Sequence, residues 1–577
     1  MKFDEIAYQR PDIKEVAAQF DILLGKLDGA KTNPELDSAM EAVNQLRSEF
    51  ESMGAIVYIR HTVDTADQFY KKEQDYFDQT GPHYGNLVTK YYKALIKSRH
   101  RPYLEKKWGK QLFVLAELAE KTFKPEIIED LQQENKLSTE YTQLLASAKI
   151  LFEGQERTLS QMVPFIISPD RAMRKKAAQA KYGFFVQNET KLDEIYDNLV
   201  KIRVAIARKL GFKDFVELGY ARMCRSDYNA DMVANFREQV KEYIVPIASK
   251  LRQAQRLRLG LDALKYYDEP LSFTDGNATP KGPPEWIIDN GKKMYSELSP
   301  ETKEFFDFMV DRGLLDLLSK KDKAGGGYCT YLSKYKYPYI FANFNGTAGD
   351  INVLTHEAGH AFQAYRTKDL IVPEYHSPTA EACEIHSMSM EFFTWPWMEL
   401  FFKEDIKKYK FSHLGNALLF MPYGVAVDEF QHYVYSNPGD SPAQRKAAWR
   451  RIEKKYLPHR DYEDNAYLEN GGFWHQQMHI FGMPFYYIDY TLAQMCAFQF
   501  WKKSLEAGNS AWTDYLKLCA AGGSKSFLEL VKLANLISPF EDGCVKSVIG
   551  LIESRLDDLN PGKHGSASLT ILSLPKY

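Results

Sequence analysis

The chain has 577 residues, of which 45% are hydrophobic and 26% charged, the composition of an ordinary soluble globular protein. Its 74 basic and 77 acidic residues leave a net charge of −3 and form no long block of one sign, which argues against binding to nucleic acid or to an anionic membrane surface. No apolar run approaches the roughly 20 residues that span a bilayer, and the acidic N-terminal segment lacks a signal-type apolar core, so we expect a cytoplasmic protein without a membrane partner.

A chain of this length exceeds what one hydrophobic core normally serves, so two or more domains, or one large lobed structure, are expected. Helical patterns dominate, as in residues 168–211, where Ser168 is a candidate cap, Asp170 complements the helix dipole and Gly211 is a plausible stop. The six cysteines are scattered without a C-x-x-C pair, which predicts reduced thiols. The apolar residues at helical spacing are Leu192, Ile195, Leu199, Ile202 and Ile206.

Two segments rich in glycine follow along the chain. Residues 272–286 combine Gly, Pro and small polar residues and predict a loop. In residues 320–350 a triple glycine precedes alternating aromatic residues and "YIFANF", which predicts a hairpin. The glycines lack the Gly-Lys-Ser/Thr ending of a phosphate-binding loop, so a flexible loop beside a substrate-binding edge strand, or a plain hairpin turn, is expected. The candidate substrate-binding residues are Gly325, Gly326, Gly327, Tyr328, Phe341, Ala342, Asn343 and Phe344.

The segment "LTHEAGHAF", residues 354–362, contains His-Glu-x-x-His. On a helix capped by Asp350, the apolar residues form one broad face, and His356 and His360 fall about 40° apart near the opposite face. The i and i+4 spacing lets both imidazoles bind one metal ion, with Glu357 placed to act on a metal-activated water. Two surface histidines would give the same short pattern, so a third ligand is needed.

A second predicted helix in residues 376–395, "HSPTAEACEIHSMSMEFFTW", supplies candidates for that ligand. Ser377 is a candidate cap, and Glu381, Glu384 and Glu391 share one face. One of these carboxylates can complete a three-ligand zinc site, while others hydrogen-bond the histidines. An acidic, solvated helix face is the plain alternative, which the apolar residues around Glu384 disfavour.

A di-iron centre is the competing metal chemistry, because two Glu-x-x-His pairs and two further glutamates build such sites in helix bundles. It leaves His356 without a role, and the strand-like segment before the motif suits a peptidase better. The residues of this alternative are Glu357 with His360, Glu429 with His432, and Glu384 and Glu391.

Residues 469–490, "ENGGFWHQQMHIFGMPFYYIDY", concentrate glycine, histidine and tyrosine. A helix from about Pro484 places Tyr486 and Tyr490 one turn apart on one face. Phenol and imidazole donors opposite a metal stabilise the oxyanion that forms when water adds to a carbonyl. Aromatic core packing explains any single tyrosine equally simply, but the density of these residues favours a cleft wall that includes His475 and His479.

Five ordered segments resemble the oligoendopeptidase F and thimet oligopeptidase family of zinc metallopeptidases, over roughly residues 165–545. The resemblance implies a mainly α, two-lobed helical ellipsoid with a deep central channel and a small β-sheet beside the metal site. We expect residues 1–205 to form an N-terminal helical lobe, and residues 206–577 a catalytic lobe with a C-terminal tail. The segments are "LDEIYDNLVKIRVAIARKLGF", "YIFANFNGTAGDINVLTHEAGHAF", "EACEIHSMSMEFF", "VDEFQHYVY" and "HIFGMPFYYIDY".

The same resemblance implies roles for individual residues. His356, His360 and Glu384 match the ligands of one Zn²⁺ per chain, and Glu357 matches the general base. His479 and a nearby tyrosine match the transition-state donors; among residues 486, 487 and 490 we favour Tyr486 and Tyr490. His386, near the expected ligand, is a candidate cleft residue without an expected role.

The implied function is hydrolysis of internal bonds in short unfolded peptides, by a monomer or homodimer whose narrow channel excludes folded proteins. "YIFANF" is expected to hold the peptide as an added strand. A carboxypeptidase or dipeptidyl carboxypeptidase is the nearest alternative. Such an enzyme needs a basic residue to bind the free C-terminus, and the sequence does not place one.

Overall fold

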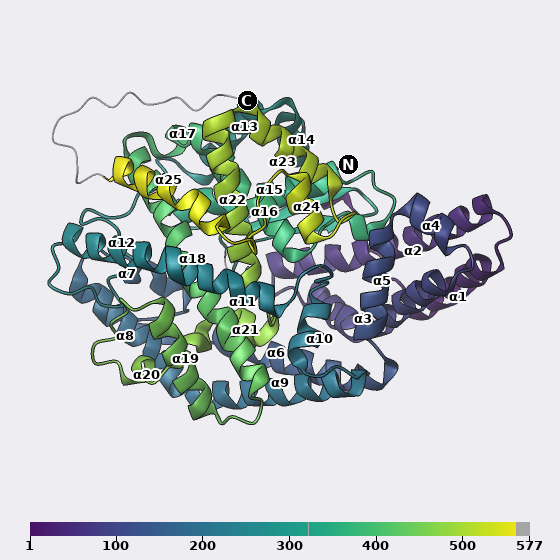
Figure 1. The fold of residues 1–577 in the computed structure, drawn as a ribbon, viewed down its shortest axis with the longest axis horizontal. Coiled ribbons are helices and arrows are strands. Elements are labelled where there is room, and N and C mark those ends of the chain that lie inside the picture. Colours follow the sequence, from purple (N-terminus) through teal and green to yellow (C-terminus); the bar gives the residue numbers. More distant parts are fainter. Residues whose placement is uncertain (321, 561–577) are drawn as a thin grey trace.

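The computed structural model describes residues 1–320 and 322–560, and it is mainly helical with two small sheets, as predicted (Figure 1). The C-terminal tail expected from the sequence falls in residues 561–577, outside the described residues. Among the described helices, none combines the length and apolar character that crossing a membrane requires. All six cysteines are free thiols, three buried and three half-buried.

The first five helices enclose a hydrophobic core of their own and form the extension at the right of Figure 1. Helix α2 begins with a capping box, because Thr32 accepts the amide of Glu35 and the Glu35 carboxylate accepts the amide of Thr32. Tyr375, from a distant part of the chain, joins this core and donates its hydroxyl to the Trp108 carbonyl at 2.7 Å. The helices are α1 (Ile13–Gly29), α2 (Asn33–Val63), α3 (Gln68–Lys97), α4 (Arg101–Trp108) and α5 (Lys110–Thr122).

The next helices share the larger core with the second half of the chain. The segment from 168 contains two helices, and Asp170, not Ser168, caps the first by accepting the amide of Ala172 at 2.9 Å. Gly211 ends the second in the left-handed conformation that favours glycine, as predicted. The expected lobe boundary at residue 205 stays a prediction. The helices are α6 (Ile128–Ala146), α7 (Val163–Ile166), α8 (Arg171–Gln187), α9 (Glu189–Leu210), α10 (Phe215–Arg222), α11 (Ala230–Gln239), α12 (Val245–Arg258), α13 (Pro284–Leu298) and α14 (Pro300–Asp311).

A three-stranded sheet lies before the His-Glu-x-x-His helix and includes the predicted hairpin. Strand β5 (Tyr337–Phe344) is its centre, paired in parallel with β3 (Leu315–Leu318) and antiparallel with β4 (Tyr328–Leu332). The expectation that "YIFANF" is a substrate-binding edge strand is therefore wrong, because both edges of β5 are already paired. The other sheet is a hairpin of β1 (Ile150–Phe152) and β2 (Gln155–Arg157).

Helix α15 (Ala348–Arg366) carries the His-Glu-x-x-His motif and starts earlier than predicted. Thr347 is its N-cap, while Asp350 lies in the first turn and accepts the amides of Asn345 and Gly346 at 2.9 and 2.8 Å. The carboxylate thus fixes the loop that leads from β5 into the helix. The predicted apolar face is buried: Ile351, Leu354, Ala358, Ala361, Phe362 and Tyr365.

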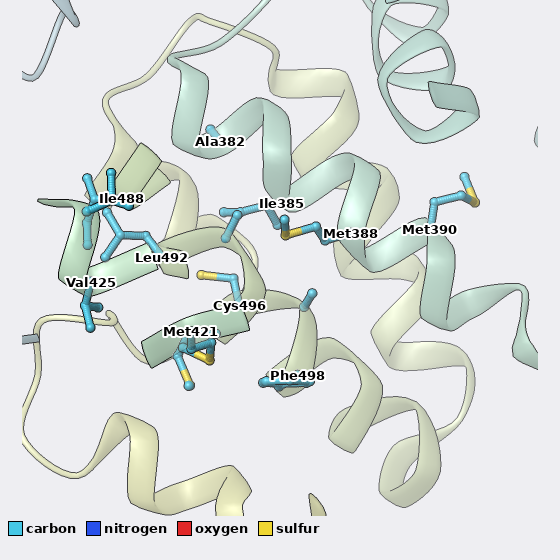
Figure 2. Close-up of a cluster of buried hydrophobic side chains, with 14 of the residues drawn as sticks. Ala382, Ile385, Met388, Met390, Met421, Val425, Ile488, Leu492, Cys496 and Phe498 are labelled. Carbon is cyan, nitrogen blue, oxygen red and sulfur yellow. The ribbon is translucent and has the colours of Figure 1, made fainter. Parts of the chain in front are cut away.

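Three helices around α15 pack their apolar faces together and build the core under the motif (Figure 2). Ile385 and Met388 come from α16, Met421 from α18, and Leu492 from α22. This packing fixes α16 and α22 relative to each other. The helices of the second half are α16 (Ala380–Phe393), α17 (Glu399–Phe402), α18 (Ile406–Ser436), α19 (Pro442–Tyr456), α20 (Ala466–Glu469), α21 (Met478–Gly482), α22 (Tyr487–Ala507), α23 (Asn509–Ala521), α24 (Phe527–Leu533) and α25 (Cys544–Leu559).

Helices α15 and α16 approach most closely at Gly359, between the two motif histidines. A Cβ added there would lie 2.6 Å from the carbonyl oxygen of His386 and 2.6 Å from the Cα of Ser387. Both atoms belong to the backbone of α16, so a side chain on Gly359 would force the helices apart. The absence of a side chain at Gly359 is therefore what allows the two helices to lie this close.

Replacing Gly359 with Ala should lower the free energy of unfolding by about 1–3 kcal/mol, because the packed helices must separate to admit one methyl group. Urea unfolding measures the change. Gly25→Ala is the control, since nothing lies within 4 Å of a Cβ added at that helical position and alanine favours helix. Equal stability of the two variants would contradict this account of the helix contact.

Candidate metal centre and catalytic cavity

Three side chains from α15 and α16 converge on one point. Glu384 Oε2 lies 3.2 Å from His356 Nε2 and 3.5 Å from His360 Nε2. Their ligand atoms lie within 4.8 Å of one another, and this is the one such group of His, Cys, Asp or Glu side chains in residues 1–320 and 322–560. Helical spacing brings the histidines together, and the close helix contact at Gly359 brings the carboxylate to them.

The donor set fits a zinc ion. Ligand atoms about 2.0–2.1 Å from zinc at tetrahedral angles lie about 3.3 Å from one another, which matches the two spacings to Glu384. Two imidazoles and one carboxylate leave the fourth tetrahedral position open. The negative charge of Glu384 also favours zinc binding. Burial raises the pKa of this carboxyl, but the adjacent His360 and His356 lower it well below its usual range, so Glu384 is ionised.

A hydrogen-bonded chain orients His356 from behind. Its Nδ1 lies 2.8 Å from Glu391 Oε1, and the other oxygen of Glu391 lies 2.7 Å from His413 Nε2. Trp395 donates its indole N–H to His413 Nδ1 at 3.2 Å, so the His413 proton is on Nε2, directed at Glu391. Burial opposes ionisation of Glu391, yet its two histidine partners lower its pKa to about 2. The carboxylate therefore holds the proton of His356 on Nδ1 and leaves Nε2 free for a metal.

His413 is a residue that sequence reasoning missed. It lies 22 residues after Glu391, on α18, and only the packing of α18 against α16 brings the two together. No spacing rule connects these positions. A lone histidine in "KFSHLGN" carries no signal that would have identified it.

Glu357 is buried beside the ligand set but is not one of its donors. Burial raises its pKa above the ordinary value, as expected for a carboxylate that takes up a proton. The glycine loop passes close to it: a Cβ on Gly327 would lie 3.6 Å from Glu357 Oε1. Asn343 fixes this loop by donating to the carbonyls of Ala324 and Gly326 at 2.8 and 2.9 Å.

The candidate oxyanion donors predicted from the sequence, His479, Tyr486 and Tyr490, form a second group of side chains. Gln477 donates its amide to His479 Nδ1 at 2.8 Å, which leaves the proton on Nε2, 3.4 Å from the Tyr490 hydroxyl. Burial lowers the pKa of His479 to about 4, so the ring is neutral at pH 7 and donates from Nε2. Tyr486 differs from the expectation, since it donates to Glu384 Oε1 at 2.6 Å.

A cavity of about 350 Å³ connects these groups. His479 and Tyr490 face it from one side and Glu391 from another, and α18 completes it. The cavity therefore joins two candidate donors, His479 and Tyr490, to Glu391, the carboxylate that orients the ligand His356. The lining residues are Asn352, Met388, Glu391, His413, Asn416, Ala417, Phe420, His479, Tyr487, Tyr490 and Gln494.

Three sequence-based assignments are wrong. Glu381 does not hydrogen-bond a histidine; it is fully buried, and Arg225 is the main charge acting on it. His475 does not line the cleft, because it is fully buried and hydrogen-bonds Tyr467 and Asp193. His386 is likewise fully buried, against Tyr515, and not in the cleft.

The expected substrate-binding strand also requires correction. Phe341, Ala342 and Phe344 are buried in the central strand and are not available to a peptide. Residues 328–331 of β4, an edge strand, are half-buried. Tyr328, the first residue of this strand, stacks on Phe341 with 4.7 Å between the ring centroids. The open-edged strand that follows Gly327, close to Glu357, is thus β4, not β5.

The di-iron alternative fails on geometry. Glu429 is bound by Lys455 at 2.9 Å and by Tyr456, and His432 contacts Tyr220 at 3.1 Å. Neither residue belongs to the group around Glu384. The second Glu-x-x-His pair is an internal polar contact of α18 with its neighbours.

Comparisons with known proteins show what this chain is similar to. Residues 3–123 match the model of the peptidase M3 N-terminal domain, and residues 287–548 match peptidase family M3. The solved structure of PZ peptidase A with an inhibitor is 62% identical, with a TM-score of 0.94 over 97% of this chain and 100% of that one. A structure from Bacillus anthracis is 58% identical, with a TM-score of 0.90 over 98% and 99%. An oligoendopeptidase F homolog of Borreliella burgdorferi is 22% identical over 74% of each chain.

Replacing Glu384 with Gln should lower zinc affinity by about 100-fold or more, because the anionic ligand is lost. Competition with a chromophoric chelator measures the affinity, and metal analysis gives the stoichiometry, expected at one zinc per chain. Glu381→Gln is the matched control, three residues earlier on the same helix and equally buried. Unchanged zinc affinity in the Glu384 variant would remove it from the ligand set.

Proposed function

The chain belongs to peptidase family M3 and is a metalloendopeptidase, and we propose that it is a zinc-dependent oligoendopeptidase that hydrolyses internal bonds of short, unfolded peptides. One observation carries the proposal. A buried carboxylate, Glu357, lies within electrostatic reach of His356 and His360, and a neutral imidazole, His479, lies within reach of Glu384, so both flank the same three-residue ligand set. That arrangement supplies a base for water and a donor for the carbonyl oxygen. A cytoplasmic location and a monomeric or homodimeric state remain part of the proposal.

The residues that would hold the zinc are His356, His360 and Glu384. A bound zinc ion supplies Lewis acidity, which polarises the peptide carbonyl and lowers the pKa of water. Glu391 and Tyr486 keep the ligands aligned, through His356 Nδ1 and Glu384 Oε1 respectively. Tyr486 is thus proposed as a positioning residue in place of the transition-state donor expected from the sequence.

Glu357 accepts the proton of the attacking water at its carboxylate and later gives it to the leaving amine. Its raised pKa favours the first transfer, because a more basic carboxylate removes the proton from water more readily. The N–H of His479 and the hydroxyl of Tyr490 donate to the oxygen that becomes negative. Gln477 holds His479 in the tautomer that allows this.

The peptide backbone is proposed to add along the open edge of β4. Within the described part of the chain, residues 328–331 make no backbone–backbone hydrogen bonds other than those of the ladder with β5. A strand added there passes Gly327, whose missing side chain leaves space beside Glu357. Backbone pairing recognises extended chains of many sequences, which suits unfolded substrates.

Replacing Glu357 with Gln should lower kcat by at least about 1,000-fold while leaving zinc bound, because the amide cannot accept the proton from water. Hydrolysis of a quenched fluorescent peptide and metal analysis of the same sample provide the two measurements. Glu399→Gln, at an exposed position outside the cavity, is the control. Retained activity in the Glu357 variant would exclude it as the base.

Replacing Tyr490 with Phe should lower kcat by about 10–100-fold with little change in zinc affinity, because one oxyanion donor is lost. Tyr487→Phe is the matched control: Tyr487 lines the same cavity, but its ring lies against Tyr423 and Phe420. Steady-state kinetics on one peptide distinguish the two. A larger loss in the Tyr487 variant would reverse the assignment.

A further inference from the structure

A second cavity, of about 380 Å³, adjoins the catalytic one. Asn416 lines both cavities. Gln476 lines the second, and His479, three residues later, lines the first. The two cavities are therefore neighbours, which share Asn416 on α18 and are lined by nearby residues of the 476–479 segment. An extended peptide that continued past Asn416 would reach the second cavity.

Lys181, on α8, is the unusual group in this second cavity. Its ammonium donates to Gln476 Oε1 at 2.7 Å, and among the described residues it has no ion pair with a carboxylate. The neighbouring lysines of the same helix are paired, Lys175 with Glu463 at 2.7 Å and Lys176 with Glu153 at 2.6 Å. Lys181 is thus a half-buried cation whose partners are a neutral amide and the ring of Tyr182, which lies 5.0 Å from its ammonium.

The other cations of the cavity, Arg252 and Arg460, have a carboxylate partner. Arg460 and Arg252 lie 2.8 and 3.5 Å from the carboxylate of Glu269. With Lys181 they make three cations and one carboxylate in the lining, so the cavity has an excess of positive charge. Aromatic rings supply the remaining walls: Tyr182, Tyr266, Tyr267 and Phe473.

Withdrawing an ammonium group from water without a counter-ion costs free energy, and burial lowers the pKa of Lys181 to about 8. An incoming carboxylate restores the missing charge partner and forms a charge-assisted hydrogen bond. An unpaired cation in a cavity that continues from the catalytic site is therefore a candidate for substrate recognition.

We propose that Lys181, together with Gln476, binds a carboxylate of the peptide substrate, either the free C-terminal carboxylate or an acidic side chain. This inference rests on the proposed peptidase function. Gln476 and His479 are three residues apart, so their Cα atoms are separated by at most about 11 Å. At about 3.3 Å per extended residue, and with the reach of the Lys181 and His479 side chains added, the bound carboxylate lies within about five residues of the cleaved bond. Binding the C-terminus there would make the enzyme cleave at a fixed distance from the end of the peptide.

The test uses quenched fluorescent peptides that end two to six residues beyond the cleaved bond, each made as a free acid and as a C-terminal amide. For the unaltered enzyme, KM should be about tenfold lower for the acid than for the amide at one or two lengths, the effect of one charge-assisted hydrogen bond. Lys181→Met should remove this difference by raising KM for the acid only. Lys181→Arg, which keeps the charge, should retain part of it.

Lys176→Met is the matched control, five residues earlier on α8 and outside both cavities. Hydrolysis of the amide peptides at an unchanged rate shows that the Lys181 variant is folded. A second series of amidated peptides carries Glu in place of Gln at successive positions. A Lys181-dependent preference for Glu identifies an acidic side chain as the ligand, and a preference for the free acid identifies the C-terminus.

The inference would be overturned if the acid-to-amide and Glu-to-Gln ratios of KM were the same in the Lys181→Met variant and in the unaltered enzyme. Failure of the proposed function is distinguishable, because the unaltered enzyme would then cleave neither series, or would cleave both in the presence of a zinc chelator.

Discussion

The close contact between α15 and α16 is the constraint on which the rest of the site depends. Two histidines one turn apart are available on any helix, but the third ligand must come from another element. Gly359 lets the backbone of α16 approach the motif, with 2.6 Å separating a hypothetical Cβ from the His386 carbonyl oxygen. Glu384 then lies 3.2 and 3.5 Å from the two imidazoles. A single missing side chain thus determines whether the ligand set can form.

Around that contact, buried polar groups are held by partners on several helices. Glu391 connects His356 on α15 to His413 on α18, and Tyr486, preceding α22, connects to Glu384 on α16. Because a buried carboxylate without partners is costly, these bonds stabilise the fold and orient the ligands together. The apolar core of Figure 2 holds the same three helices, α16, α18 and α22, in register. Catalytic geometry and core packing therefore depend on the same elements.

The surroundings of the site account for the kind of substrate proposed. The open edge of β4 favours extended chains, and the two adjoining cavities give such a chain a limited space that ends at an unpaired cation. A carboxypeptidase would require that cation within one or two residues of the zinc. Lys181 instead lines the second cavity and not the one that His479 lines, which suits cleavage inside a short peptide.

The sequence by itself determined the local features: the mainly helical fold, the hairpin before the motif, and the pairing of His356 with His360. These follow from periodicity and spacing, which operate over a few residues. The candidate Glu384 came from an apolar context and a family resemblance, whereas spacing alone left Glu381 and Glu391 equally possible.

Only the tertiary structure decided which strand is central, which residues are buried and which distant groups meet. In the order β3-β5-β4, "YIFANF" belongs to the central strand, and the packing of the helices buries His475. The partnership of His413 with Glu391 and the unpaired state of Lys181 arise from contacts between elements far apart in the chain. Such contacts depend on how whole helices pack, and no short pattern in the sequence records that.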